Sequence, residues 1–170
     1  DMAQQTLILN QDKSIVPDLI TMAESSPNEL ARIHALWTLE GLGELKSDLV
    51  KKLLEDPNPN IRIQGLRAAE TLYKYGENSL LEIYRTAAMD KNTDVANQAL
   101  LSAHVLKIDQ VEILIKETME KNSSNGIQVI GSQLLEKMEE AKKASETRFD
   151  KNELALFVKG KSIYDNYCST

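Results

Sequence analysis

The feature of this sequence that most restricts its fold is a pattern that occurs four times at nearly constant spacing. Four apolar runs start at residues 31, 61, 95 and 127, so that successive starts are 30, 34 and 32 residues apart. Apolar residues recur within each run at helical spacing. The residues before each run are rich in Ser, Asn, Asp and Pro, which cap helices or set turns. The pattern therefore predicts four helices, each preceded by a tight turn.

Aligned by their first residues, the four runs agree position by position. The fifth position always holds a small residue: Ala35, Gly65, Ala99 and Gly131. The twelfth position is always apolar: Leu42, Leu72, Leu106 and Met138. A small residue lets one helix approach another closely, and the ~1 kcal/mol that Gly costs inside a helix argues for such a reason. We expect the helix of one hairpin to approach its neighbour at the fifth position.

Shorter amphipathic segments lie between the runs and predict partner helices over 16–23, 45–54, 80–89 and 111–119. Each unit then consists of a helix, a tight turn and a second helix. A period of 30–34 residues in which no unit buries its apolar face alone is typical of helical repeats. The predicted fold class is all-α, an α-α superhelix, in which 2–9 is the second half of a unit and the charged segment 127–147 caps the end.

The units resemble HEAT repeats over roughly residues 2–145. In that family the run after the turn often reads hydrophobic-Arg-x-x-Ala-Leu, and Ile61-Arg62 with Gly65-Leu66 matches it in the second unit. Ala31-Arg32 with Ala35-Leu36 matches it in the first. The Trp–Leu-Gly–Tyr and Ala–Phe–Pro positions of tetratricopeptide repeats, which have a similar period, are absent.

The later units depart from this pattern, because Ala96 and Gln128 stand where the family has Arg. HEAT proteins commonly pair that Arg with an Asp of the turn in a ladder of ion pairs. The resemblance therefore implies a ladder only around Arg32, Arg62 and Asp56.

No arrangement of residues indicates catalysis, so this segment is predicted not to be an enzyme. His34 and His104 occupy different positions of different units, and neither has Cys or carboxylate at metal-ligand spacing. A Gly-rich phosphate loop and a Ser/His/Asp arrangement are also missing. The net charge of −6 and the lack of a basic stripe argue against nucleic acid as a partner. No apolar run is long enough for membrane insertion.

Protein domains are therefore the expected partners, with Trp37, Arg32 and Arg62 as candidate interaction residues. Trp37 follows the core position Leu36 and has two readings. It either anchors a partner, since Trp is enriched at interaction hot spots, or fills space beside small neighbours. The tyrosines near Gly76 are expected to pack against one another: Tyr73, Tyr75 and Tyr84.

The segment after residue 147 resembles the start of a c-type cytochrome domain. Such domains often open with Gly-Lys-x-hydrophobic-aromatic, then three residues, then Cys-x-x-Cys-His; Gly160, Lys161, Ile163, Tyr164 and Cys168 match this. The resemblance implies that Cys168 is the first haem-attachment cysteine. The sequence ends before the second Cys and the His, so no cofactor is expected in this segment, and covalent haem c belongs to a longer parent. We expect two domains, 1–147 and a truncated 148–170; the alternative is an unrelated amphipathic tail.

Residues 31–42 also resemble HEAT segments of large bacterial proteins described as putative membrane-bound dehydrogenases. Those proteins join a β-propeller to HEAT repeats and a C-terminal cytochrome c domain. The resemblance implies a non-catalytic scaffold, spacer or docking module in an exported, periplasmic redox protein, although the opening residues lack the features of a signal peptide. The alternatives are a freestanding HEAT-type adaptor and a HEAT-fold enzyme similar to bilin lyases or DNA glycosylases.

Overall fold

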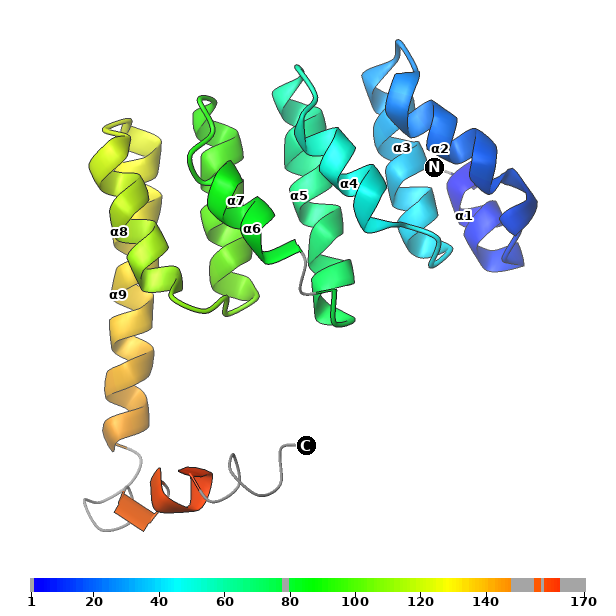
Figure 1. Cartoon of the computed structure of the whole chain (residues 1–170). Coiled ribbons are helices and arrows are strands. Elements are labelled where there is room, and N and C mark those ends of the chain that lie inside the picture. Colours follow the sequence, from blue (N-terminus) through cyan, green and yellow to red (C-terminus); the bar gives the residue numbers. More distant parts are fainter. Residues whose placement is uncertain (1, 78–79, 148–154, 157, 163–170) are drawn as a thin grey trace. The chain divides into compact units, whose positions relative to one another are not determined.

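The computed structural model describes residues 2–77, 80–147, 155–156 and 158–162. Over these residues the chain is helical and contains no strand, which confirms the all-α prediction (Figure 1). The helices are α1 (Met2–Asn10), η1 (Lys13–Ile15), α2 (Val16–Ser25), α3 (Glu29–Gly41), α4 (Ser47–Leu54), α5 (Pro59–Lys74), α6 (Leu81–Ala87), α7 (Thr93–Val105), α8 (Val111–Lys121) and α9 (Asn125–Thr147).

The chain divides into two compact units, Asp1–Gly131 and Ser132–Thr170. In the second unit, the remainder of α9 is rich in charged residues, and residues 155–156 and 158–162 are helical and exposed. Cys168, Ile163 and Tyr164, which carry most of the cytochrome resemblance, lie outside the described residues.

The first unit is built from pairs of consecutive helices. Helix α2 packs on α3, α4 on α5 and α6 on α7, while α8 contacts α7 and precedes the start of α9 (Figure 1). The second helices of successive pairs also touch, α3 with α5 and α5 with α7. Helix α1 contacts α3 in the same way, which agrees with the expectation that it is a second helix.

One turn joins the two helices of each pair, and its hydrogen bonds repeat. A side-chain oxygen accepts from the backbone N–H two residues later at Ser26, Asp56, Asp90 and Asn122. These four positions have the same 30, 34 and 32 spacing as the apolar runs. Asn28, Asn58 and Asn92 then cap α3, α5 and α7 by accepting from backbone N–H groups of the first turn. The residues that predict the helix starts from the sequence therefore act through side-chain hydrogen bonds to the backbone.

A different turn joins one pair to the next, and the sequence pattern did not predict it. A left-handed residue directly follows the last turn of each second helix: Gln11 (φ 51°), Gly43 (φ 69°), Gly76 (φ 96°) and Lys107 (φ 52°). The connection from α7 to α8 has a further one, Gln110 (φ 60°), just before α8. At each of the four helix ends, the N–H of the residue after the left-handed one donates to a carbonyl five residues earlier, as in Glu44 to Leu39 and Ile108 to Ala103. This is the Schellman ending of a helix, for which Gly is the least strained residue. Because α1 ends in this way too, it matches the second helices in its ending as well as in its contacts.

The core lies between the helices of each pair and between successive second helices. The sixth position of the first three runs is fully buried: Leu36, Leu66 and Leu100. The small fifth position is also buried, and its two glycines face the first helix of their own pair and not a neighbouring hairpin. A Cβ at Gly65 would lie 3.5 Å from Leu53 of α4, and one at Gly131 would lie 2.5 Å from Met119 of α8.

The tyrosine prediction is correct for two residues and wrong for the third. The rings of Tyr73 and Tyr84 meet edge to face with centroids 6.5 Å apart. The buried Tyr84 hydroxyl donates to the Leu66 carbonyl at 3.2 Å, and burial raises the pKa of Tyr84 above its ordinary value. Tyr75 is 86% exposed because α5 ends there, immediately before the left-handed Gly76.

Candidate interaction surface

The arginine that opens the first repeat is held between two helix pairs. The Arg32 Nε donates to the Ala23 carbonyl of its own pair at 2.8 Å. Its Nη2 reaches the Asp56 carboxylate of the next pair at 2.5 Å. The side chains of Arg32 and Asp56 are only 13% and 11% exposed. The expected ion pair between them is therefore present and mostly shielded from water.

Arg62 makes the corresponding contact one repeat later. Its Nε and Nη2 donate to the two carboxylate oxygens of Asp90, each at 2.9 Å, and its Nη1 donates to the Asp56 carbonyl at 2.7 Å. The carboxylate partner is thus Asp90, and Asp56 contributes only its backbone oxygen. Asp90 occupies the same turn position as Asp56, 34 residues further along. Extending the repeat alignment to the turns would have identified it.

Asp56 shows the electrostatic effect of this arrangement. Burial opposes ionisation of its carboxyl group, but hydrogen bonds from Arg32 and from the Asn58 backbone N–H outweigh it, with further help from the charge of Arg62. The net result is a pKa below the ordinary value of the Asp56 side chain. The Asp56 carboxylate that pairs with Arg32 is therefore ionised near neutral pH.

The ladder ends after two ion pairs. Ala96 occupies the arginine position of α7 and is fully buried. At the next arginine position, Gln128 turns back on its own pair and donates to the carbonyls of Met119 and Asn122 at 2.8 and 2.9 Å. Since Arg32 and Arg62 are engaged within the chain, their contact with a partner protein remains a prediction.

Successive second helices are also joined by polar contacts that the sequence pattern did not reveal. The Thr71 hydroxyl donates to Glu40 at 2.8 Å, which joins α5 to α3. The Ser102 hydroxyl donates to Glu70 at 2.6 Å, which joins α7 to α5. Both carboxylates occupy the tenth position of their runs, so the repeat places the acceptors even though the donors differ in position.

Trp37 lies where α3 and α5 meet. Its indole N–H donates to Gln64 Oε1 at 2.9 Å, and the guanidinium carbon of Arg67 lies 5.8 Å from the ring centroid. The residue is half-buried: it bonds to α5, as the space-filling interpretation expects, and part of it is reachable from solvent. Its role as an anchor for a partner stays a prediction. Arg67 was not singled out from the sequence, although it occupies the same seventh position of its run as Trp37.

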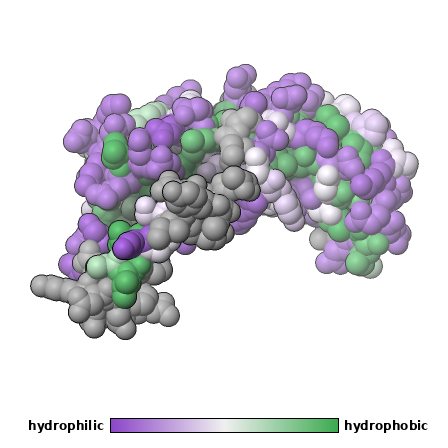
Figure 2. All heavy atoms as spheres, turned by 60° about the horizontal axis from the view of Figure 1, so that its bottom comes forward, coloured by the Kyte–Doolittle hydropathy of each residue, from purple (hydrophilic) through white to green (hydrophobic). Residues whose placement is uncertain are grey.

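We call the surface of α3, α5 and α7 that carries Trp37, Arg67 and Leu101 the second-helix face. Leu101 is the seventh residue of its run and is 37% exposed. His34 is exposed on α3 and contacts Gln4 of α1, with no contact to His104. On the side of the molecule visible in Figure 2, hydrophilic residues predominate and hydrophobic ones form small separate groups.

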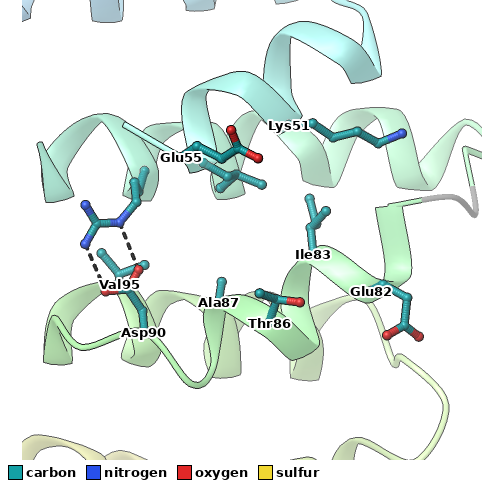
Figure 3. Close-up of a pocket in the computed structure, with 10 residues that line it drawn as sticks. Lys51, Glu55, Glu82, Ile83, Thr86, Ala87, Asp90 and Val95 are labelled. Atoms are coloured by element: carbon teal, nitrogen blue, oxygen red, sulfur yellow. Dashed lines mark hydrogen bonds and ion pairs between the residues drawn. The ribbon is translucent and has the colours of Figure 1, made fainter. Parts of the chain in front are cut away.

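A groove of about 390 Å³ lies on the other side of the pairs, between α4 and α6 (Figure 3). Ile83, Ala87 and Val95 supply apolar lining, and the paired Arg62 and Asp90 close one end of it. The edges carry charged residues of both signs: Lys51, Glu55 and Glu82. The charges at its closed end satisfy each other, so the groove offers a ligand apolar contact in its interior and charged groups only at its edges.

No group of three or more His, Cys, Asp or Glu residues is close enough to hold a metal ion in the part of the chain that the structure describes. Among the described helices, none has both the length and the apolar content needed to cross a membrane. Gly160 and Lys161 are helical and exposed, whereas Cys168 is not among the described residues.

No protein-family model matches this chain, and neither a curated protein nor a solved structure matches it. The case for a function therefore depends on the repeat, its ladder and the second-helix face.

Proposed function

We propose that this chain is a non-catalytic helical-repeat scaffold, a HEAT-like α-α superhelix that docks protein domains on its second-helix face. The observation that carries the proposal is the pair of equivalent contacts Arg32–Asp56 and Arg62–Asp90, each of which joins one helix pair to the next. Contacts that repeat at equivalent positions are what a scaffold of stacked units requires. They fix the relative positions of the side chains that a partner meets.

The second-helix face has the composition of a docking surface. It combines a half-buried Trp, an Arg and an exposed Leu at one position of three successive runs, and Trp and Arg are the residues most enriched at interaction hot spots. Polar contacts between its helices, such as Thr71 with Glu40, favour a rigid surface that loses little entropy on binding.

The parent we propose is an exported bacterial redox protein in which this segment links a propeller-type dehydrogenase domain to a cytochrome c domain. The support is the match of Gly160, Lys161 and Cys168 to the cytochrome opening, together with the order of the HEAT-like and cytochrome-like segments. In that parent Cys168 would form the first thioether to haem, in the periplasm or another exported compartment. The redox chemistry would belong to the flanking domains.

The test of this parent is the coding sequence beyond Thr170. We expect Cys and His as the next two residues, and a covalently bound haem in the purified full-length protein by absorbance after denaturation. Any other pair of residues contradicts the cytochrome assignment and leaves the freestanding adaptor as the function.

Two enzymatic alternatives have simple tests. A DNA glycosylase-like role predicts binding to DNA at low salt, which the net charge of −6 disfavours. A bilin lyase-like role predicts a change in bilin absorbance on titration with the chain. We expect neither signal.

A further inference from the structure

We propose that Trp37 and Arg67 form a clamp for a carboxylate side chain of the partner protein, with an adjacent apolar residue of that partner resting on Leu101. The inference rests on the proposed docking role and specifies its chemistry. The ligand class is an acidic side chain next to an aliphatic one, presented by a protein surface or an extended segment.

Arg67 differs from the arginines of the ladder. The guanidinium groups of Arg32 and Arg62 are shielded and each is paired with a carboxylate. Arg67 is exposed and makes no ion pair or hydrogen bond to any residue that the structure describes; its guanidinium lies over the Trp37 ring. Its N–H donors are therefore available to a partner.

The ring beneath Arg67 is held in place. The Trp37 N–H donates to Gln64, which lies on the same helix as Arg67 and three residues before it, so the indole is tied to α5 beside the guanidinium. A guanidinium over an aromatic face is attracted by the ring while the N–H groups at its edge stay free. Those groups match the two oxygens of a carboxylate. The arrangement is thus prepared for an acidic side chain.

Nearby carboxylates do not compete for Arg67. Glu70 accepts from Ser102 and Glu40 accepts from Thr71, so both are directed to neighbouring helices. They still add negative potential to this face, and the chain has a net charge of −6. A singly charged carboxylate beside an apolar group is therefore favoured over a polyanion or a phosphate.

The test uses the full chain and two matched probes, N-acetyl-leucyl-glutamyl amide and its glutaminyl counterpart. Proton–nitrogen NMR follows the Trp37 indole N–H and the Arg67 Nε–H during each titration. We expect saturable shifts of both signals with the glutamyl probe only. Arg67→Gln should weaken the apparent affinity about tenfold, the loss typical of a hydrogen bond to a charged group. The apparent affinity of Arg67→Lys should lie between those of the wild type and Arg67→Gln, because Lys keeps the charge but lacks the planar guanidinium.

Lys74→Gln is the matched control, since it removes one positive charge at an exposed position of α5 without touching the Trp37 ring. Equal shifts with both probes, or unchanged shifts in Arg67→Gln, overturn the clamp. Inorganic phosphate that binds as well as the glutamyl probe overturns the preference for carboxylate. If the clamp fails while Trp37 is still covered by a flanking domain in the full-length protein, the docking function stands without it.

Discussion

Within the unit 1–131, the first helix pairs are linked to one another differently from the last ones. From α2 to α7, successive pairs are linked by shielded ion pairs, Arg32 to Asp56 and Arg62 to Asp90. In α7 the arginine position holds Ala96, and in α9 it holds Gln128, which bonds within its own pair. The same backbone turn occurs at both ends. A repeated turn therefore does not require a repeated charge.

The last pair is closely packed, and the connection before it holds two residues other than Gly in the left-handed conformation, Lys107 (φ 52°) and Gln110 (φ 60°). A Cβ at Gly131 would lie 2.5 Å from the Met119 sulfur, whereas the equivalent Gly65 has ordinary contact distances around it. The turn that leads into α8 has Lys107 in the left-handed position, where two earlier connections have Gly43 and Gly76. We infer that α8 and the start of α9 are the less firmly joined end of this unit.

The largest predicted loss of stability follows from replacing Arg62. Arg62→Met should lower the free energy of unfolding by about 3 kcal/mol, because it leaves Asp90 shielded and unpaired and frees the Asp56 carbonyl. Gln128→Met should cost about 1 kcal/mol, since only neutral hydrogen bonds are lost. Urea denaturation followed by circular dichroism measures both.

The control for Arg62 is the double variant Arg62→Met with Asp90→Asn, which removes both charges and keeps the side-chain acceptor for the Asn92 N–H. It should recover part of the loss, because no unpaired charge is then left shielded from water. Equal losses for Arg62→Met and Gln128→Met contradict the distinction between the two ends.

The second effect concerns the small fifth position. Gly65→Ala should stabilise the chain by about 0.5–1 kcal/mol, because Ala is the better helix residue and its Cβ finds contacts of 3.5 Å. Gly131→Ala should destabilise by about 1 kcal/mol, because the Met119 side chain has to move. Thermal unfolding of the two variants compares them, and a stabilising Gly131→Ala would show that the last pair is not closely packed.

Helix order could be predicted from the sequence because it depends on local patterns, whereas the Arg32–Asp56 ion pair was expected only from the resemblance of the repeats to a known family. Apolar spacing and capping residues specify a helix and its start without reference to distant groups. The partner of Arg62 was missed because the alignment compared helices and left out the turns, where Asp90 stands. Trp37 was identified, but its contact with Arg67 depends on which positions of neighbouring helices meet, and only the packing decides that.

The third effect tests the connections between pairs. Lys107→Gly should stabilise by about 0.5–1 kcal/mol, because Gly takes the left-handed conformation without strain. Gly76→Ala should cost about 1 kcal/mol for the opposite reason. Calorimetry of both variants is the measurement. An unchanged unfolding temperature in both variants would mean that the left-handed conformation of these turns carries no energetic cost for residues other than Gly.

The smallest effect is that of acid on the ladder. The folded pKa of Asp56 is lowered, so the unfolded chain takes up its proton first as the pH falls through the ordinary value of 3.8. The stability that Asp56 contributes is therefore present above that value and is lost below it. Asp12 and Glu44 also have lowered pKa values, from hydrogen bonds with Ser14 and Lys13 respectively.

Asp56→Asn isolates the ladder contribution, because Asn keeps a turn acceptor and loses the charge. The stability difference between wild type and this variant should shrink between pH 7 and pH 3. A difference that is constant with pH contradicts the charged state of the ion pair.

The Schellman turns and the Glu40–Thr71 contact illustrate what sequence reasoning leaves out. Lys107 and Gln11 give no glycine signal, yet both take the left-handed conformation because the chain has to reverse there. Thr71 is a common helix residue whose role appears only when α3 lies beside α5. Both depend on tertiary geometry, which a single sequence without an alignment does not reveal.

The central claim is that protein partners dock on the second-helix face, and oxidative side-chain footprinting of the full-length gene product tests it most directly. The oxidation rate of each side chain in the full-length protein is compared with its rate in the isolated chain. The residues followed on the second-helix face are Trp37 and Leu101. The comparison residues are Met22 in α2 and Met89 just after α6, which are 41% and 39% exposed. We predict that Trp37 and Leu101 lose reactivity in the full-length protein while Met22 and Met89 keep it. Protection of the two methionines with Trp37 unchanged would contradict the account.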